Sequence, residues 1–159
     1  MIVFHYLTKP LICSILEPVP DCFLTDPIWQ CIHGKHIRVA LGPKFGSGNR
    51  MGYTKIPLEF DNPRRPSKVA MYWTDNKSKW QHDYLTFDDL KPGRPSKKGV
   101  EVVVLHGDYK GHTFNVNKVT RSDDTVTLST TSNAIVLPAT HVCMVESHLE
   151  RGCSCSKLQ

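Results

Sequence analysis

The chain has 159 residues, which is enough for one ordinary domain or two small ones, and its formal charge is +5. This mild basic excess is compatible with nucleic acid, an acidic protein or an anionic membrane surface as a partner, and it selects none of them. The six cysteines avoid residues 32–142 altogether, which argues against a disulfide scaffold and favours an intracellular protein with reduced thiols.

Residues 1–26 contain three prolines and apolar residues in no sustained period. We expect a poorly ordered N-terminal extension here. The opening stretch lacks a basic start and is interrupted by Lys9 and Pro10, so it predicts neither a secretory signal nor a transmembrane helix.

Residues 27–90 have the pattern of a first β domain. The stretch HIRVAL places Ile37, Val39 and Leu41 on one face, as in a half-buried strand. The stretch YTKIPLEF alternates again, although Pro57 restricts it to an edge or a bulge. The stretch from residue 68 to residue 90 then predicts a hairpin around a polar TDNKSK tip.

Most of the positive charge lies in this first half. Between residues 27 and 82 there are ten basic residues against three acidic ones. Aromatic residues interleaved with basic ones are typical of nucleic-acid surfaces, although two or three of these aromatic residues are expected in the core. A solvated loop surface is the alternative interpretation. The residues concerned are Arg64 and Arg65 as contact candidates, and Tyr53, Tyr72, Trp73 and Trp80 as the aromatic set.

Residues 91–99, KPGRPSKKG, contain two prolines, two glycines and four basic residues. Prolines stiffen a segment and block regular strand pairing, so we expect a basic linker and a domain boundary here.

Residues 100–147 alternate more cleanly than the first half. VEVVVL, TFNVNKV, TVTLST and AIVL are four strand candidates that turn-forming residues separate, and THVCMVES is a fifth. Short strands without intervening helices predict a small antiparallel barrel. No part of the chain has a sustained helical period, and residues 148–159 are expected to form a flexible tail.

The stretch VEVVVLHGDYKGHTFNVNKV resembles the KOW motif of ribosomal proteins and NusG-class transcription elongation factors. In that motif a strand enters a charged loop flanked by glycines, which here are Gly107 and Gly111. Phe114 stands where many KOW sequences have a third glycine. The first half, from GKHIRVAL onward, is similar to a degenerate copy. The resemblance implies an all-β protein with two SH3-like barrels in tandem, at 27–90 and 100–147, and little helix.

The resemblance also implies a non-catalytic binding module without a cofactor, acting on RNA or DNA in a transcription-related or ribosomal complex, with a nuclear location. Tyr109 would stack on a base, and Lys110 would pair with a phosphate. The contact residues that it implies are His106, Asp108, Tyr109, Lys110 and His112 at the hairpin tip, with Lys97 and Lys98 on the approach.

Three alternatives stay open. The first is a pair of purely protein-binding barrels that recognise an acidic partner. The second is a zinc site near the C-terminus, although Cys153 and Cys155 are separated by one residue instead of the usual two to four, and Cys143 fits a small core residue. The third is an enzyme, for which the chain offers no P-loop, dinucleotide-binding or zincin motif. The zinc candidates are His141, Cys143, His148, Cys153 and Cys155.

Overall fold

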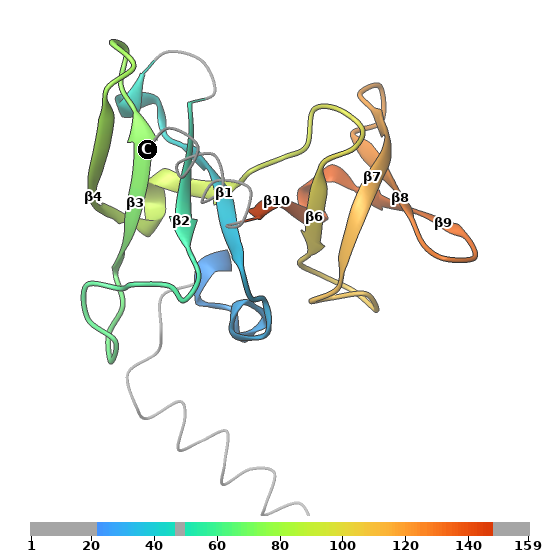
Figure 1. The fold of residues 1–159 in the computed structure, drawn as a ribbon, viewed down its shortest axis with the longest axis horizontal. Helices are drawn as coiled ribbons and strands as arrows, with labels where there is room; N and C mark the ends of the chain where they lie inside the picture. The colour runs from blue at the N-terminus through green and yellow to red at the C-terminus, as the bar shows by residue number, and fades with distance from the viewer. Residues whose placement is uncertain (1–21, 47–49, 148–159) are drawn as a thin grey trace, which may run out of the picture.

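The computed structural model describes residues 22–46 and 50–147. Within them the protein is all-β, as the sequence predicted. Ten strands belong to one antiparallel sheet in the order β4-β3-β2-β1-β10-β6-β7-β8-β9, and β5 pairs with β1 (Figure 1). Helical structure is limited to 3-10 turns, which confirms the low helix content. The strands are β1 Lys35–Leu41, β2 Met51–Lys55, β3 Lys68–Thr74, β4 Trp80–Thr86, β5 Leu90–Pro92, β6 Glu101–Val104, β7 Thr113–Thr120, β8 Thr125–Ser129, β9 Ala134–Pro138 and β10 Val142–Ser147.

The first half is organised around the inward face of β1. Ile37 and Val39 are fully buried, as the alternation in HIRVAL predicted. The 3-10 turns η1 (Phe23–Thr25) and η2 (Pro27–Cys31) add Leu24 and Trp29 to the same core, each only 1% exposed. The described part of the segment that we expected to be poorly ordered, residues 22–26, is therefore a packed part of this core, and residues 1–21 lie outside the described structure. The other 3-10 turns are η3 Pro43–Phe45, η4 Phe87–Asp89 and η5 Ala139–His141.

The strands β6 and β10 are buried on both faces because a separate apolar cluster lies on each side of them. Val103 and Cys143 belong to the first core, whereas Val102 and Val142 belong to a second core with β7 and β8. A strand buried on both faces reads as a continuous apolar run, which accounts for the uninterrupted VVV sequence at residues 102–104.

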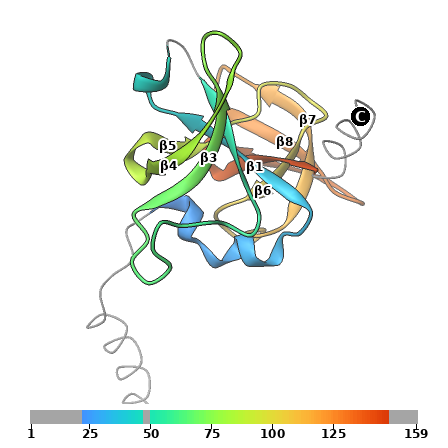
Figure 2. The same ribbon diagram turned by 60° about the vertical axis from the view of Figure 1, so that its left-hand side comes forward.

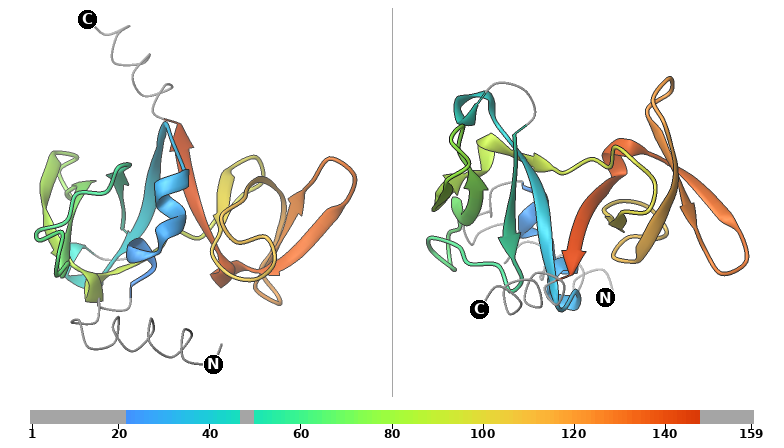
Figure 3. Two further views of the ribbon diagram at one scale, coloured as in Figure 1. Left: turned by 90° about the horizontal axis from the view of Figure 1, so that it is seen from below. Right: turned by 45° about the horizontal axis from the view of Figure 1, so that its top comes forward.

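The two halves meet where β1 and β10 pair, and Figures 2 and 3 show these strands running side by side between the two groups of strands. Ile37 pairs with Val145 in this antiparallel ladder. The sheet does not close, because β4 and β9 are its two ends. The all-β class is thus confirmed, while the two SH3-like barrels stay a prediction.

The start of the predicted linker is part of the fold. Residues 90–92 form β5, and the Gly93 backbone both donates to the Arg38 carbonyl at 3.0 Å and accepts from the Met144 N–H at 2.8 Å. The apolar core of the first half also contains side chains from β6 and β10 of the second half. A division of the chain at residues 91–99 therefore does not separate two cores.

Candidate nucleic-acid interface

The turn between β6 and β7, residues 106–112, is the hairpin tip that the KOW-like stretch predicted. Gly107 and Gly111 both have left-handed backbone angles, with φ of 88° and 86°, which side chains disfavour. Backbone hydrogen bonds close the turn: Lys110 N–H donates to the Gly107 carbonyl at 3.2 Å, and Gly111 N–H donates to the Val104 carbonyl at 2.8 Å. The two glycines and these hydrogen bonds therefore hold residues 106–112 in one defined turn.

Aromatic rings cluster on this turn. Tyr109 is 40% exposed and meets Phe114 edge-on at 5.8 Å between ring centroids. His112 stacks on Phe114 at 6.3 Å, and His106 contacts His141 at 5.0 Å. Phe114, the residue in place of the third motif glycine, therefore supports the rings of the tip. Sequence reasoning did not predict that His141 would join these rings, because His141 lies in the turn η5 that precedes β10.

Lys110 is held by an ion pair. Its Nζ lies 2.8 Å from an Asp26 carboxylate oxygen. The other Asp26 oxygen accepts from the Ile28 N–H at 3.0 Å and so caps η2. Partial burial would raise the pKa of Asp26, but the hydrogen bonds from Lys110 and from the Ile28 backbone, with the Lys110 charge, lower it overall. A phosphate would compete with Asp26 for Lys110.

Lys97 and Lys98 lie at the opposite end of β6 from the hairpin tip. Lys97 lines a polar groove of about 620 Å³ along β1, β6 and β10. Two other cations of this groove are already paired: Lys35 Nζ lies 2.6 Å from Glu101, and Arg38 lies 3.3 Å from Glu146. The structure therefore separates the predicted linker contacts from the predicted tip contacts.

Arg64 and Arg65 are exposed on the loop between β2 and β3. Asp61 fixes this loop by accepting from the backbone N–H groups of Ser67 and Lys68, each at 3.0 Å, and from the Ser67 hydroxyl at 2.8 Å. These hydrogen bonds lower the pKa of Asp61. In Figure 1 this loop and the hairpin tip both lie toward the lower end of the molecule.

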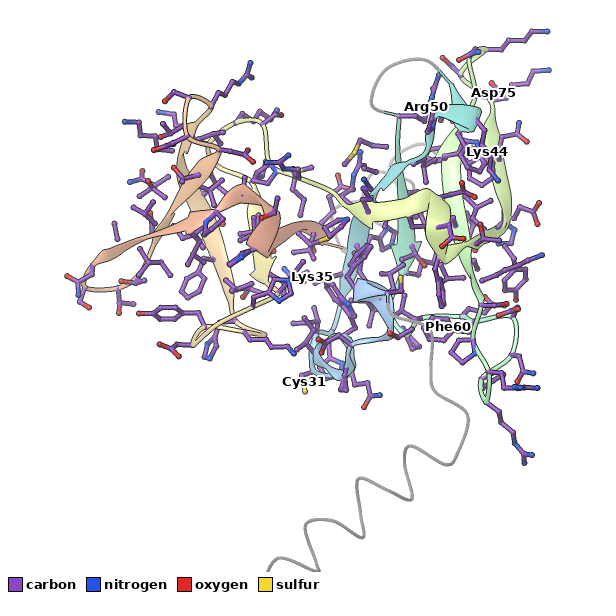
Figure 4. All side chains as sticks on the ribbon, turned by 180° about the vertical axis from the view of Figure 1, so that it is seen from behind. Cys31, Lys35, Lys44, Arg50, Phe60 and Asp75 are labelled. Atoms are coloured by element: carbon purple, nitrogen blue, oxygen red, sulfur yellow. The ribbon has the colours of Figure 1, made fainter. Side chains whose placement is uncertain are left out.

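A mainly apolar pocket of about 450 Å³ lies at this end, between the start of the described chain and the segment that follows β2. Asp26 lines it and also pairs with Lys110 at the tip. Its apolar lining comes from Leu24, Trp29, Ile56, Leu58 and Phe60, of which Phe60 is labelled in Figure 4. The sequence did not indicate this pocket.

The remaining chemistry-bearing residues form no metal centre in residues 22–46 and 50–147, where no group of three or more His, Cys, Asp or Glu is placed to hold an ion. His148, Cys153 and Cys155 of the zinc alternative lie outside the described residues. Cys143 is buried, and burial raises the pKa of its thiol to about 12, so it is a core residue as expected. Cys31, in contrast, is exposed.

The predicted aromatic set divides between core and surface. Tyr53 is 8% exposed, Tyr72 and Trp73 are partly buried, and Trp80 is 58% exposed. No helix of the described chain is long and apolar enough to cross a membrane. Comparisons with protein-family models and with curated proteins find no match to this chain.

Proposed function

We propose that the protein is a non-catalytic, cofactor-free binding module of the KOW type that contacts RNA or DNA in a transcription-related complex of the nucleus. The observation that carries this proposal is the β6–β7 tip, where two left-handed glycines hold an exposed Tyr109 beside Lys110. An exposed ring stacks on any base, and a lysine pairs with phosphate without sequence preference.

Further support comes from the charge of the same end of the molecule. Arg64 and Arg65 are exposed on a loop that Asp61 holds in one conformation, so little conformational entropy is lost when they bind. Lys97 and Lys98 lie at the other end of β6. They are therefore expected to contribute through a separate contact or through the general field of the protein.

The test is binding of the intact protein to labelled single-stranded RNA and to duplex DNA at two salt concentrations. Phosphate contacts release counterions, so affinity should fall as salt rises. Lys110→Ala and the pair Arg64→Ala, Arg65→Ala should each reduce affinity, with Arg121→Ala on the β7–β8 turn as the matched control. No binding at low salt would overturn the proposal.

A variant that is expected to raise affinity complements these variants, which are expected to lower it. Asp26→Asn keeps an η2 cap but removes the charge that holds Lys110. It should raise affinity and steepen the salt dependence by about one counterion, because Lys110 becomes available to phosphate. Asp88→Asn, in η4, removes the same charge elsewhere and should have a smaller effect. Equal effects of the two variants would show that Lys110 makes no specific contact.

The apolar pocket favours a second candidate function, the binding of an acidic protein partner. A pocket of about 450 Å³ lined by Trp29, Leu58 and Phe60 suits an apolar side chain of a partner. Lys110, which pairs with Asp26 of the pocket lining, would then meet an acidic residue of the partner. This candidate gains support only if the nucleic-acid assay is negative at low salt and Leu58→Arg abolishes a crosslinked complex in cells.

A further inference from the structure

Four rings form a continuous row across the outer face of the first half, one from each of β1 to β4. We call His36, Tyr53, Tyr72 and His82 the aromatic row. Their ring centroids are 4.7, 5.2 and 4.3 Å apart in that order, and their planes are tilted by only 7°, 15° and 13°. The register explains the row, because Tyr53 pairs with Tyr72 and Tyr72 pairs with His82.

Trp80 lies across this row. Its ring is 5.7 Å from Tyr53 with an interplanar angle of 82°. The neighbouring rings of His36 and Tyr72, from the strands on either side, cover both faces of Tyr53. Trp80 therefore meets the edge of the Tyr53 ring, with the two ring planes nearly perpendicular. Despite this contact Trp80 is 58% exposed, so more than half of its surface is accessible to solvent.

The hairpin that carries Trp80 is held in place before any ligand arrives. Asp75 accepts from the backbone N–H groups of Lys77 and Lys79 at 2.8 and 3.0 Å. Arg50 donates to the Thr74 carbonyl at 2.8 Å from the other side, and Figure 4 shows Arg50 and Asp75 together at this end. A preorganised platform loses little entropy on binding.

The surroundings of Trp80 are cationic. Lys77 and Lys79 are exposed on the adjoining turn, and Lys55 Nζ lies 4.9 Å from the centre of the Tyr72 ring. Asp75, the acid of this turn, already accepts three hydrogen bonds, the third from Gln81 Nε2 at 3.0 Å. A flat exposed ring among lysines complements a ligand with unpaired planar bases and a chain of phosphates.

We propose that Trp80 is a base-stacking platform for single-stranded RNA or DNA, with Lys55, Lys77 and Lys79 as its phosphate contacts. This inference rests on the proposed nucleic-acid function and deepens it, since it assigns a second contact surface and the single-stranded class of ligand. Duplex bases are already stacked on one another and cannot use the platform without unstacking.

The test measures fluorescence anisotropy with a labelled uridine oligomer, a deoxythymidine oligomer, an abasic oligomer of equal length, and a duplex. Trp80→Ala should weaken binding of both single strands roughly tenfold. Trp80→Phe should retain most of the affinity but lose the quenching of tryptophan fluorescence that stacking on the indole causes. Neither variant should change binding of the abasic oligomer, which has phosphates but no bases.

The controls separate this proposal from the general function. Val136→Ala removes an exposed apolar side chain in the second half and should change nothing. Thermal unfolding of Trp80→Ala should match that of the unchanged protein, because the ring is mostly exposed. If Lys110→Ala weakens binding and Trp80→Ala does not, the platform is wrong and the function stands. If the unchanged protein binds no strand at low salt, or binds an acidic peptide instead, both proposals fail.

Discussion

The Nζ atom of Lys110 lies 2.8 Å from the carboxylate of Asp26, so the tip of the β6–β7 hairpin is tied to the segment that begins the described chain. This ion pair joins the second half of the protein to the first outside the β1–β10 ladder. An external anion must therefore compete with the Asp26 carboxylate for Lys110. The strength of that pair therefore affects both stability and the proposed binding.

Asp26→Asn is predicted to lower the free energy of unfolding by about 0.5 kcal/mol near neutral pH, as expected for a partly exposed pair. Folding lowers the pKa of Asp26 below its ordinary value of 3.8. The ionised Asp26 therefore contributes to the free energy of unfolding at pH values above 3.8. This contribution is lost as the pH falls through the lower pKa that Asp26 has in the folded protein. Urea unfolding of both proteins at several pH values measures the difference, which should vanish in acid. A constant difference at all pH values would contradict this account.

Leu24→Ala is predicted to destabilise the protein by about 2–5 kcal/mol, because it leaves a cavity in the first core. Leu24 is 1% exposed there, although it precedes the first predicted strand. Chemical denaturation gives the value, and Val136→Ala, at a site 62% exposed, should change stability by less than about 0.5 kcal/mol. If Leu24→Ala lowered the free energy of unfolding as little as the control does, residues 22–26 would be a loose extension and not a part of the core.

Gly93→Ala is predicted to cost about 2 kcal/mol, since a Cβ atom there would lie 2.7 Å from the Arg38 carbonyl oxygen and 2.7 Å from the Met51 side chain. Gly42→Ala is the matched control, because its Cβ would make an ordinary contact of 3.4 Å with Asp89. The thermal unfolding midpoints of the two variants provide the comparison. Equal midpoints would mean that residues after β5 behave as the free linker that their composition indicates.

Cys143 and Cys31 are predicted to differ sharply in reactivity. Burial raises the pKa of the Cys143 thiol to about 12, so almost no thiolate forms at neutral pH, whereas Cys31 is exposed. Peptide mapping after brief treatment with iodoacetamide should find Cys31 alkylated and Cys143 unmodified. Repeating the treatment in denaturant should modify both. Rapid alkylation of Cys143 in the folded protein would show that the first core opens easily.

Period-two alternation predicted the strands well where one face is buried. Ile37 and Val39 point into the core, and the hairpin of β3 and β4 follows the pattern around its TDNKSK tip. The strands β7 to β9 were predicted in the same way, and the turns between β6 and β7, between β7 and β8 and between β8 and β9 each contain Gly, Asp, Asn or Ser. Alternation reports burial on one face of a strand, and this is a local property.

Period-two alternation could not predict which strands pair when they are far apart in the sequence. The composition of residues 91–99 indicated a linker, yet Lys91 pairs with Ala40 and Pro92 with Val39, beyond the part of β1 that pairs with β10. The candidate interface shows the same limit. Trp80 was recognised as one of several aromatic residues, but its place across Tyr53 depends on the register of three strands. Register is fixed by the whole sheet, so sequence alone could not separate Trp80 from the core aromatic residues.

The sharing of β6 and β10 between two cores affects how the chain can fold during its synthesis. β1 leaves the ribosome long before β10, so the nascent first half has neither its Ile37–Val145 neighbour nor the contribution of Val103 and Cys143 to its core. Unpaired strand edges associate readily with other chains. The emerging polypeptide is thus expected to depend on chaperone protection until β10 appears, after which both halves can become stable together.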